Sequence, residues 1–234
     1  MVLTGAFLNG LFIVVGSLVG LSFRNIPNKT KESVLIIIGL AVAILGIQLS
    51  INFANFIIII ISLVVGTIIG EWLNIEGWFE KLGYKVEYLF RKQNATGKIA
   101  EGFITASLIF VIGSMAVVGA IDSGVKSDHT LLITKGIIDG FMSIFLTSTL
   151  GIGVILSAIP VFLYEGIITL SATMIENIIP KAVFTQFIQE MSATGGILIL
   201  AIGLNIAKIT NIRVANLLPS LVVVGIVMFF MQLI

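Results

Sequence analysis

The chain contains no cysteine, one histidine and few charged residues. The absence of cysteine excludes disulfides, thiolate catalysis and cysteine-based zinc or iron–sulfur sites, and a single histidine argues against a histidine-rich metal centre. Charged residues make up 11% of the 234 positions, whereas a soluble domain carries about 25%. The formal net charge of +1 indicates neither a nucleic-acid partner nor a polyanionic substrate. We therefore expect no metal, no cofactor and no nucleic acid.

Hydrophobic residues form 58% of the chain and recur in long runs, and about 20 predominantly apolar residues suffice to cross a bilayer. The sequence therefore predicts an all-α, polytopic transmembrane bundle that is one integral membrane domain over residues 1–234. Its eight predicted spans cover about residues 4–23, 33–51, 54–74, 102–122, 130–149, 151–176, 184–207 and 214–233. The first four and the last two are clear. The fifth contains Lys135 and Asp139, and the sixth contains Pro160 and Glu165, so one of these two could be broken or re-entrant, which would leave seven.

Basic residues favour the cytoplasmic side of a membrane protein, so their distribution tests the number of spans. With the N-terminus outside, the cytoplasmic connections hold most of the thirteen basic residues, namely Arg24, Lys29, Lys31, Lys81, Lys85, Arg91, Lys92, Lys98, Lys208 and Arg213. Removal of one middle span would place Lys208 and Arg213 outside. The pattern predicts eight spans with both termini outside, in the cytoplasmic membrane of a bacterium.

The connector over residues 74–101 is the one long stretch without a span. Its residues 75–92 place apolar side chains at i, i+3, i+4 and i+7 with basic residues between them, which is typical of an amphipathic helix. Such a helix, with aromatic residues on its apolar side, is expected to lie in the cytoplasmic interface of the bilayer. A helix that binds a partner protein is the alternative.

Three pairs of glycines are spaced four residues apart within predicted spans. They are Gly16 and Gly20, Gly66 and Gly70, and Gly136 and Gly140. This spacing puts both glycines on one face of a helix and lets a neighbouring backbone approach closely. Packing within the chain is the simpler interpretation, and a homo-oligomer interface is the alternative.

Ionisable groups at the centre of a spanning helix cost at least about 2.5–3.5 kcal/mol each, so each one indicates a functional site. In the fifth span, Lys135, Asp139, Ser143 and Thr147 recur every fourth residue and form one polar stripe. We expect this stripe to line a path for a small solute or ion. Alternatively, Lys135 and Asp139 lie near the outer end of the helix and reach water there.

The seventh span opens with polar and small residues. Adjacent Gly195 and Gly196 would allow a local unwinding, and broken helices bind ions or carboxylates in many transporters. A site in this helix would be lined by Glu190, Ser192, Thr194 and Asn205. The alternative is ordinary helix crossing through the small residues, with Glu190 near the outer interface.

Glu165 lies deep in the sixth span, five residues after Pro160, and is a candidate proton or cation site. The alternative is a protonated carboxyl group that is hydrogen-bonded to a neighbouring helix. Asn9 in the first span and Ser114 in the fourth are further candidates for the path, although interhelical hydrogen bonding explains them most simply.

No enzyme signature is present in the sequence. It has no phosphate-binding loop, no His-Glu-x-x-His motif and no Ser/His/Asp set with suitable helix placement. We therefore expect the chain not to be an enzyme and to have no catalytic residue.

Several motifs resemble the bacterial polytopic membrane proteins catalogued as domain of unknown function 554. The resemblance covers essentially the full chain and rests on Gly5, Asn9, Gly16 and Gly20, on residues 65–71 (VGTIIGE), on residues 113–124 (GSMAVVGAIDSG), and on Ser192–Gly196 with residues 202–205 (IGLN). Proline is frequent in this family where Ser114 stands, and the departure weakens an argument for a kink in the fourth span. The family name specifies no activity, so the resemblance implies a membrane fold and leaves the function open.

Two functions follow from these features. The first is a small transporter or channel-like permease that moves a small solute or ion along a polar path through spans one, four, five, six and seven. The second is a membrane sensor or assembly partner that acts through the 75–92 helix and the glycine faces. The buried carboxylates favour the transporter.

Overall fold

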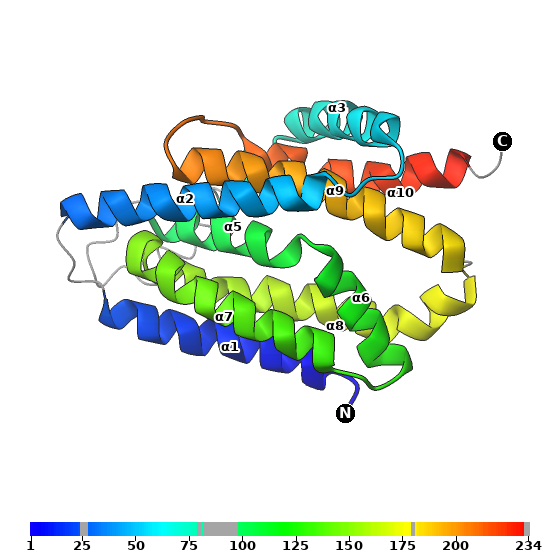
Figure 1. The fold of residues 1–234 in the computed structure, drawn as a ribbon, viewed down its shortest axis with the longest axis horizontal. Coiled ribbons are helices and arrows are strands. Elements are labelled where there is room, and N and C mark those ends of the chain that lie inside the picture. Colours follow the sequence, from blue (N-terminus) through cyan, green and yellow to red (C-terminus); the bar gives the residue numbers. More distant parts are fainter. Residues whose placement is uncertain (24–27, 79–80, 82–97, 179–180, 232–234) are drawn as a thin grey trace. The chain divides into compact units, whose positions relative to one another are not determined.

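The computed structural model describes residues 1–23, 28–78, 81, 98–178 and 181–231, which form helices joined by short connections. The helices are α1 (Thr4–Ser22), α2 (Asn28–Ser50), α3 (Phe56–Leu73), α5 (Lys98–Val111), α6 (Ser114–Val125), α7 (Thr130–Leu150), η1 (Ile152–Ser157), α8 (Ala158–Ile178), α9 (Lys181–Ile206), η2 (Val214–Leu217) and α10 (Pro219–Met231) (Figure 1). The all-helical prediction is confirmed. Most of the predicted amphipathic helix over 75–92 lies outside the described residues.

The chain packs into two compact units. Unit 1 comprises residues 1–34, 80–111 and 115–179, and unit 2 comprises residues 35–79, 112–114 and 180–234. Unit 1 therefore contains α1, α5, α6, α7, η1 and α8, while unit 2 contains most of α2 together with α3, α9, η2 and α10. The chain alternates between the units, so neither is a continuous stretch of sequence. The single integral membrane domain over 1–234 stays a prediction.

Helices α1 and α7 of unit 1 pack side by side (Figure 1). A Cβ atom on Gly16 would lie 2.0 Å from the Gly140 carbonyl oxygen, and one on Gly20 would lie 2.4 Å from the Ile144 carbonyl oxygen. Gly136 in turn faces the Cα of Asn9 at 2.9 Å. Contacts advance in the same direction along both helices, so the two run parallel. Only glycine permits this close backbone approach.

The side chains of α1 are arranged with small and polar groups inside and large apolar groups outside. Its buried residues include Asn9, Ser17 and several glycines, whereas Phe7, Leu11, Val15 and Leu18 are exposed. Large apolar side chains are exposed in the same way along α7 and α8. A soluble protein would bury these groups, because apolar surface is driven out of water. Lipid is therefore the solvent that covers these faces.

In unit 2, α2 and α9 form a second glycine contact (Figure 1). A Cβ on Gly39 would lie 2.7 Å from the Gly203 carbonyl oxygen, and a Cβ on Gly46 would lie 2.7 Å from the Gly196 carbonyl oxygen. The pairing runs in opposite directions along the two helices, so they are antiparallel. The sequence analysis missed this contact, because its glycines are seven residues apart on each helix rather than four.

Helix α3 packs on η2 and α10 in unit 2. A Cβ on Gly66 would lie 2.4 Å from the backbone nitrogen of Ser220, and one on Gly70 would lie 1.8 Å from the Asn216 carbonyl oxygen. Asparagines fix both ends of α3. The Asn55 side chain accepts a hydrogen bond from the Ile57 N–H at 3.0 Å, and Asn74 adopts the left-handed conformation that ends the helix. All six glycines of the predicted pairs thus contact other helices of the same chain.

The fourth predicted span is bent rather than continuous. Residues 101–111 of α5 and 115–125 of α6 meet at an angle of 61°. Gly113 lies at the break with φ +142°, a conformation that L side chains rarely adopt. The sequence did not predict this bend in the fourth span, and Gly113 lies at the break.

The fifth and sixth spans, for which a break was considered, are uninterrupted. Helix α7 runs from Thr130 to Leu150, and residues 152–175 form one candidate span. Pro160 lies in the first turn of α8, where its missing N–H has no partner to lose, so it does not kink the helix.

Within the described residues, seven helices are long and apolar enough to span a membrane, and eight spans result if the bent pair α5–α6 counts as one. The directions of the helices favour eight. Because α1 and α7 are parallel, an odd number of crossings separates them, and α2, α3 and the bent pair supply three. Helices α2 and α9 are antiparallel, so an even number of crossings separates them. Helix α3, the bent pair, α7 and α8 supply four, which again gives eight spans.

Helix α9 is continuous from Lys181 to Ile206. Of the two alternatives for Gly195 and Gly196, the structure therefore shows helix crossing through small residues and no local unwinding. A Cβ on Gly196 would lie 2.6 Å from the backbone nitrogen of Ser50 on α2, and a Cβ on Gly195 would lie 2.4 Å from the Ile112 side chain. These glycines serve close packing, while the helix keeps its backbone hydrogen bonds.

Candidate functional site

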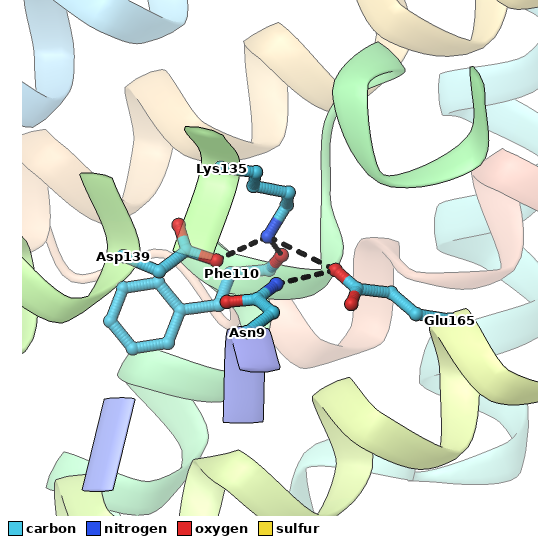
Figure 2. A network of polar contacts seen from close by, with 5 residues as sticks. All are labelled: Asn9, Phe110, Lys135, Asp139 and Glu165. Carbon is cyan, nitrogen blue, oxygen red and sulfur yellow. Dashed lines mark hydrogen bonds and ion pairs between the residues drawn. The ribbon is translucent and has the colours of Figure 1, made fainter. Parts of the chain in front are cut away.

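A buried network of charged and polar groups lies inside unit 1. It joins Asn9 of α1, the backbone carbonyl of Phe110 at the end of α5, Lys135 and Asp139 of α7, and Glu165 of α8 (Figure 2). Lys135 is 6% exposed, Asp139 is 7% exposed and Glu165 is fully buried. Figure 2 shows the side chains converging on the Lys135 ammonium group. The predicted alternative, in which Lys135 and Asp139 reach water at the helix end, does not match this inward placement.

Lys135 lies at the centre of the network. Its ammonium donates a hydrogen bond to the Phe110 carbonyl oxygen at 2.6 Å and another to the Asp139 carboxylate. The nitrogen lies 3.5 Å from Glu165 Oε1, and this same oxygen accepts a hydrogen bond from Asn9 Nδ2 at 2.6 Å. An ammonium has three donors, and two of them form hydrogen bonds here, while Glu165 Oε1 lies at ion-pair distance.

The fold brings these groups together through three local features. Lys135 and Asp139 are four residues apart, which places them on one face of α7. The bend at Gly113 ends α5 at Val111, so the carbonyl of Phe110 has no partner within its helix. The parallel packing of α1 and α7 then carries Asn9 to the same place.

The two halves of the polar stripe on α7 have different roles. Lys135 and Asp139 belong to the network, whereas Ser143 donates hydrogen bonds to the carbonyl oxygens of Ile13 at 3.1 Å and Gly140 at 2.7 Å. Thr147 contacts α1 beside Gly20. This half of the stripe therefore holds α1 against α7, and only the half with Lys135 and Asp139 carries charge.

A second buried carboxylate, Glu190, lies in unit 2. Its Oε1 accepts hydrogen bonds from the backbone N–H groups of Ala54 at 3.1 Å and Asn55 at 2.5 Å, just before α3 begins. Glu190 is fully buried rather than exposed at an interface. A carboxylate at this position also interacts favourably with the N-terminal end of the helix.

Asn205, predicted to line the same site, does not lie near Glu190 on α9. Asn205 lies 15 residues further along, which is about 22 Å of helix. Its side chain holds the turn after α9, since it donates to the Ile212 carbonyl oxygen and accepts from Ile212 N–H and the Thr210 hydroxyl. Ser192 and Thr194 are buried near Glu190 in sequence. The side chain of Ser114 lies outside the described part of the chain.

Comparison with known proteins gives the family. Residues 4–229 match the family described as "Protein of unknown function (DUF554)". The chain belongs to this family. It is 36% identical over 230 residues to "Uncharacterized membrane protein YdfK" of Bacillus subtilis (strain 168), which covers 96% of this chain and 95% of that protein.

A second relative of this DUF554 chain comes from Escherichia coli (strain K12). "Uncharacterized protein YqgA" is 28% identical over 221 residues, covering 93% of this chain and 92% of that protein. The comparison with solved structures gave no match. The resemblance inferred from the sequence motifs is confirmed, and the chain is a multi-pass membrane protein.

Proposed function

We propose that this protein is a small transporter or channel-like permease that moves a small solute or ion, and that it is not an enzyme. The observation that carries the proposal is the network around Lys135. Three ionisable groups are buried inside spanning helices, next to the point where the bent span α5–α6 is interrupted. Buried charges in a membrane are costly and typically belong to ion or substrate pathways.

The broken span supports this function in its own right. Discontinuous helices in transporters place the carbonyl ends of half-helices near the middle of the bilayer, where these carbonyls coordinate cations. The carbonyl of Phe110 occupies such a position, and the Lys135 ammonium is the cation it binds. A network of this kind can rearrange when a charged species enters.

We also propose an orientation and a location. Eight spans place both termini on one side of the membrane, and the distribution of basic residues puts that side outside the cytoplasm. The lipid of a bacterial cytoplasmic membrane would then cover the exposed apolar faces.

The alternative function, a sensor or assembly partner, has less support. Its glycine faces are used in contacts within the chain, and most of its interfacial helix lies outside the described residues. A homo-oligomer, if it forms, would need another surface.

Flux measurements in proteoliposomes test the proposal. Purified protein would be assayed for uptake of protons, Na⁺, K⁺ and a panel of small metabolites, and the variants Asp139→Asn, Glu165→Gln and Glu190→Gln would be compared with it. Glu71→Gln is the matched control, because Glu71 is exposed and pairs with Arg213 at the surface. We expect the first three variants to abolish the flux and the control to keep it. Normal flux in all three would contradict the site.

A further inference from the structure

The network around Lys135 has unused hydrogen-bond acceptors. Within the described part of the chain, Glu165 Oε2 and Asn9 Oδ1 are buried and have no hydrogen-bond partner. Both residues are fully buried, and Figure 2 shows them joined to each other beside the Lys135 ammonium group. The Lys135 ammonium donates to the Phe110 carbonyl and to Asp139 and pairs with Glu165 through Oε1, so it forms no hydrogen bond with either of these two oxygens. A buried acceptor without a donor is costly, and the site therefore lacks a donor.

The charges of the network also indicate that a group is missing, and that this group is positively charged. Lys135 contributes one positive charge, while Asp139 and Glu165 contribute two negative charges when both are ionised. The sum is one uncompensated negative charge in the interior of a membrane protein, which is unfavourable. One additional positive charge would neutralise the network.

The number of oxygens without a partner indicates which positively charged species the network can bind. Mg²⁺ takes six ligands and Ca²⁺ takes six to eight oxygens, whereas the fully buried side-chain oxygens of the network that lack a partner are two, Glu165 Oε2 and Asn9 Oδ1. Two oxygens are too few for such an ion. They suffice for a proton, which forms one O–H bond on the carboxylate and gives the network the donor it lacks.

We propose that Glu165 binds one proton at Oε2 and that Lys135 acts as the fixed counter-cation of this proton site. Water supplies the proton, which adds to the carboxylate oxygen, and release returns the proton to water with the carboxylate restored. The protonated state makes the network neutral. The role of this proton as the coupling ion rests on the proposed transport function, whereas its binding does not.

Infrared spectroscopy of the protein in liposomes tests the proton site without any flux assay. At neutral pH the wild type should show the carbonyl band of a protonated carboxyl group, and Glu165→Gln should lose it. Glu190→Gln and Glu71→Gln should keep it, whereas Asp139→Asn should weaken it, because Lys135 then balances an ionised Glu165 without the proton. Because Glu165→Gln could fail to fold, wild-type protein labelled with ¹³C at its glutamate carboxyl groups provides a second measurement, and its band should shift.

The outcomes are distinct. Absence of the band from the wild type, persistence of the band in folded Glu165→Gln, or an unshifted band in the ¹³C-glutamate sample would overturn the proton site. Loss of the band when Na⁺ replaces choline in the buffer would also overturn it, because a metal ion would then take the place of the proton. If the protein shows the normal band but no flux, the proton site stands and only the transport function is contradicted.

Discussion

The Lys135 ammonium donates a hydrogen bond of 2.6 Å to the carbonyl oxygen of Phe110, at the point where α5 ends inside the bundle of unit 1. A cation at the C-terminal end of a helix stabilises the carbonyls that have no intrahelical partner. Lys135 thus has two roles. It provides a hydrogen-bond donor for the carbonyl left free at the end of α5, and its positive charge balances the carboxyl groups of Asp139 and Glu165.

Removal of the Lys135 charge should destabilise the protein strongly. When Glu165 has released its proton, at alkaline pH, Lys135→Met leaves two buried carboxylates without their counter-cation, and loss of one partner of a buried ion pair typically costs about 3–5 kcal/mol. Thermal unfolding in detergent should show a large decrease in melting temperature. The double variant Lys135→Met/Glu165→Gln should recover part of this loss, because it also removes one of the two negative charges.

A double-mutant cycle decides whether the two residues are coupled. Additive effects of Lys135→Met and Glu165→Gln on the free energy of unfolding would mean that the residues do not interact, and the ion pair of the network would be refuted.

The glycine contact between α1 and α7 should tolerate no side chain. In Gly16→Ala the new Cβ would lie 2.0 Å from the Gly140 carbonyl oxygen, so the helices must separate, at a cost of about 1–3 kcal/mol or more. Gly10→Ala on the same helix is the control, because its Cβ would meet only ordinary contacts from 3.5 Å. It should be neutral or stabilising by up to about 1 kcal/mol. Equal melting temperatures for the two variants would contradict the packing of α1 on α7.

Glu190 should protect the connection before α3. Glu190→Ala removes the acceptor of the partly buried Ala54 and Asn55 N–H groups, and hydrogen bonds to a charged group contribute about 1.5–3 kcal/mol each. Hydrogen exchange at these two amides should accelerate by roughly tenfold or more. Gln189→Ala, at the exposed neighbouring position, should leave their exchange unchanged. Unchanged exchange in Glu190→Ala would show that the carboxylate does not hold this connection.

The individual charged residues were predictable from the sequence, and their grouping was not. Lys135, Asp139 and Glu165 stand out because ionisable residues are rare in apolar runs. Their convergence with Asn9 depends on which helices are neighbours, and that information is not local to any segment. The Phe110 carbonyl has no side-chain signature at all. The one local signal was Gly113, three residues later, whose positive φ ends the helical path.

Glycine patterns allowed two interpretations that the sequence could not separate. Gly195 and Gly196 suit both an unwound helix and a close contact, because both need a missing side chain. The structure decides for contact, since Gly46 on α2 faces Gly196. The spacing of seven between Gly39 and Gly46, repeated between Gly196 and Gly203, was the available signal, because residues seven apart share one helix face.

The central claim is that water and solute reach the buried network during transport, and cysteine labelling tests it most directly. The chain has no native cysteine, so Thr169→Cys introduces a single thiol one turn after Glu165, at a buried position whose hydroxyl has no partner. Ile167→Cys, on the exposed apolar face of α8, is the control. The account predicts that a small charged thiol reagent labels Thr169→Cys in membranes and leaves Ile167→Cys unlabelled. Labelling of Thr169→Cys no faster than that of Ile167→Cys would contradict it.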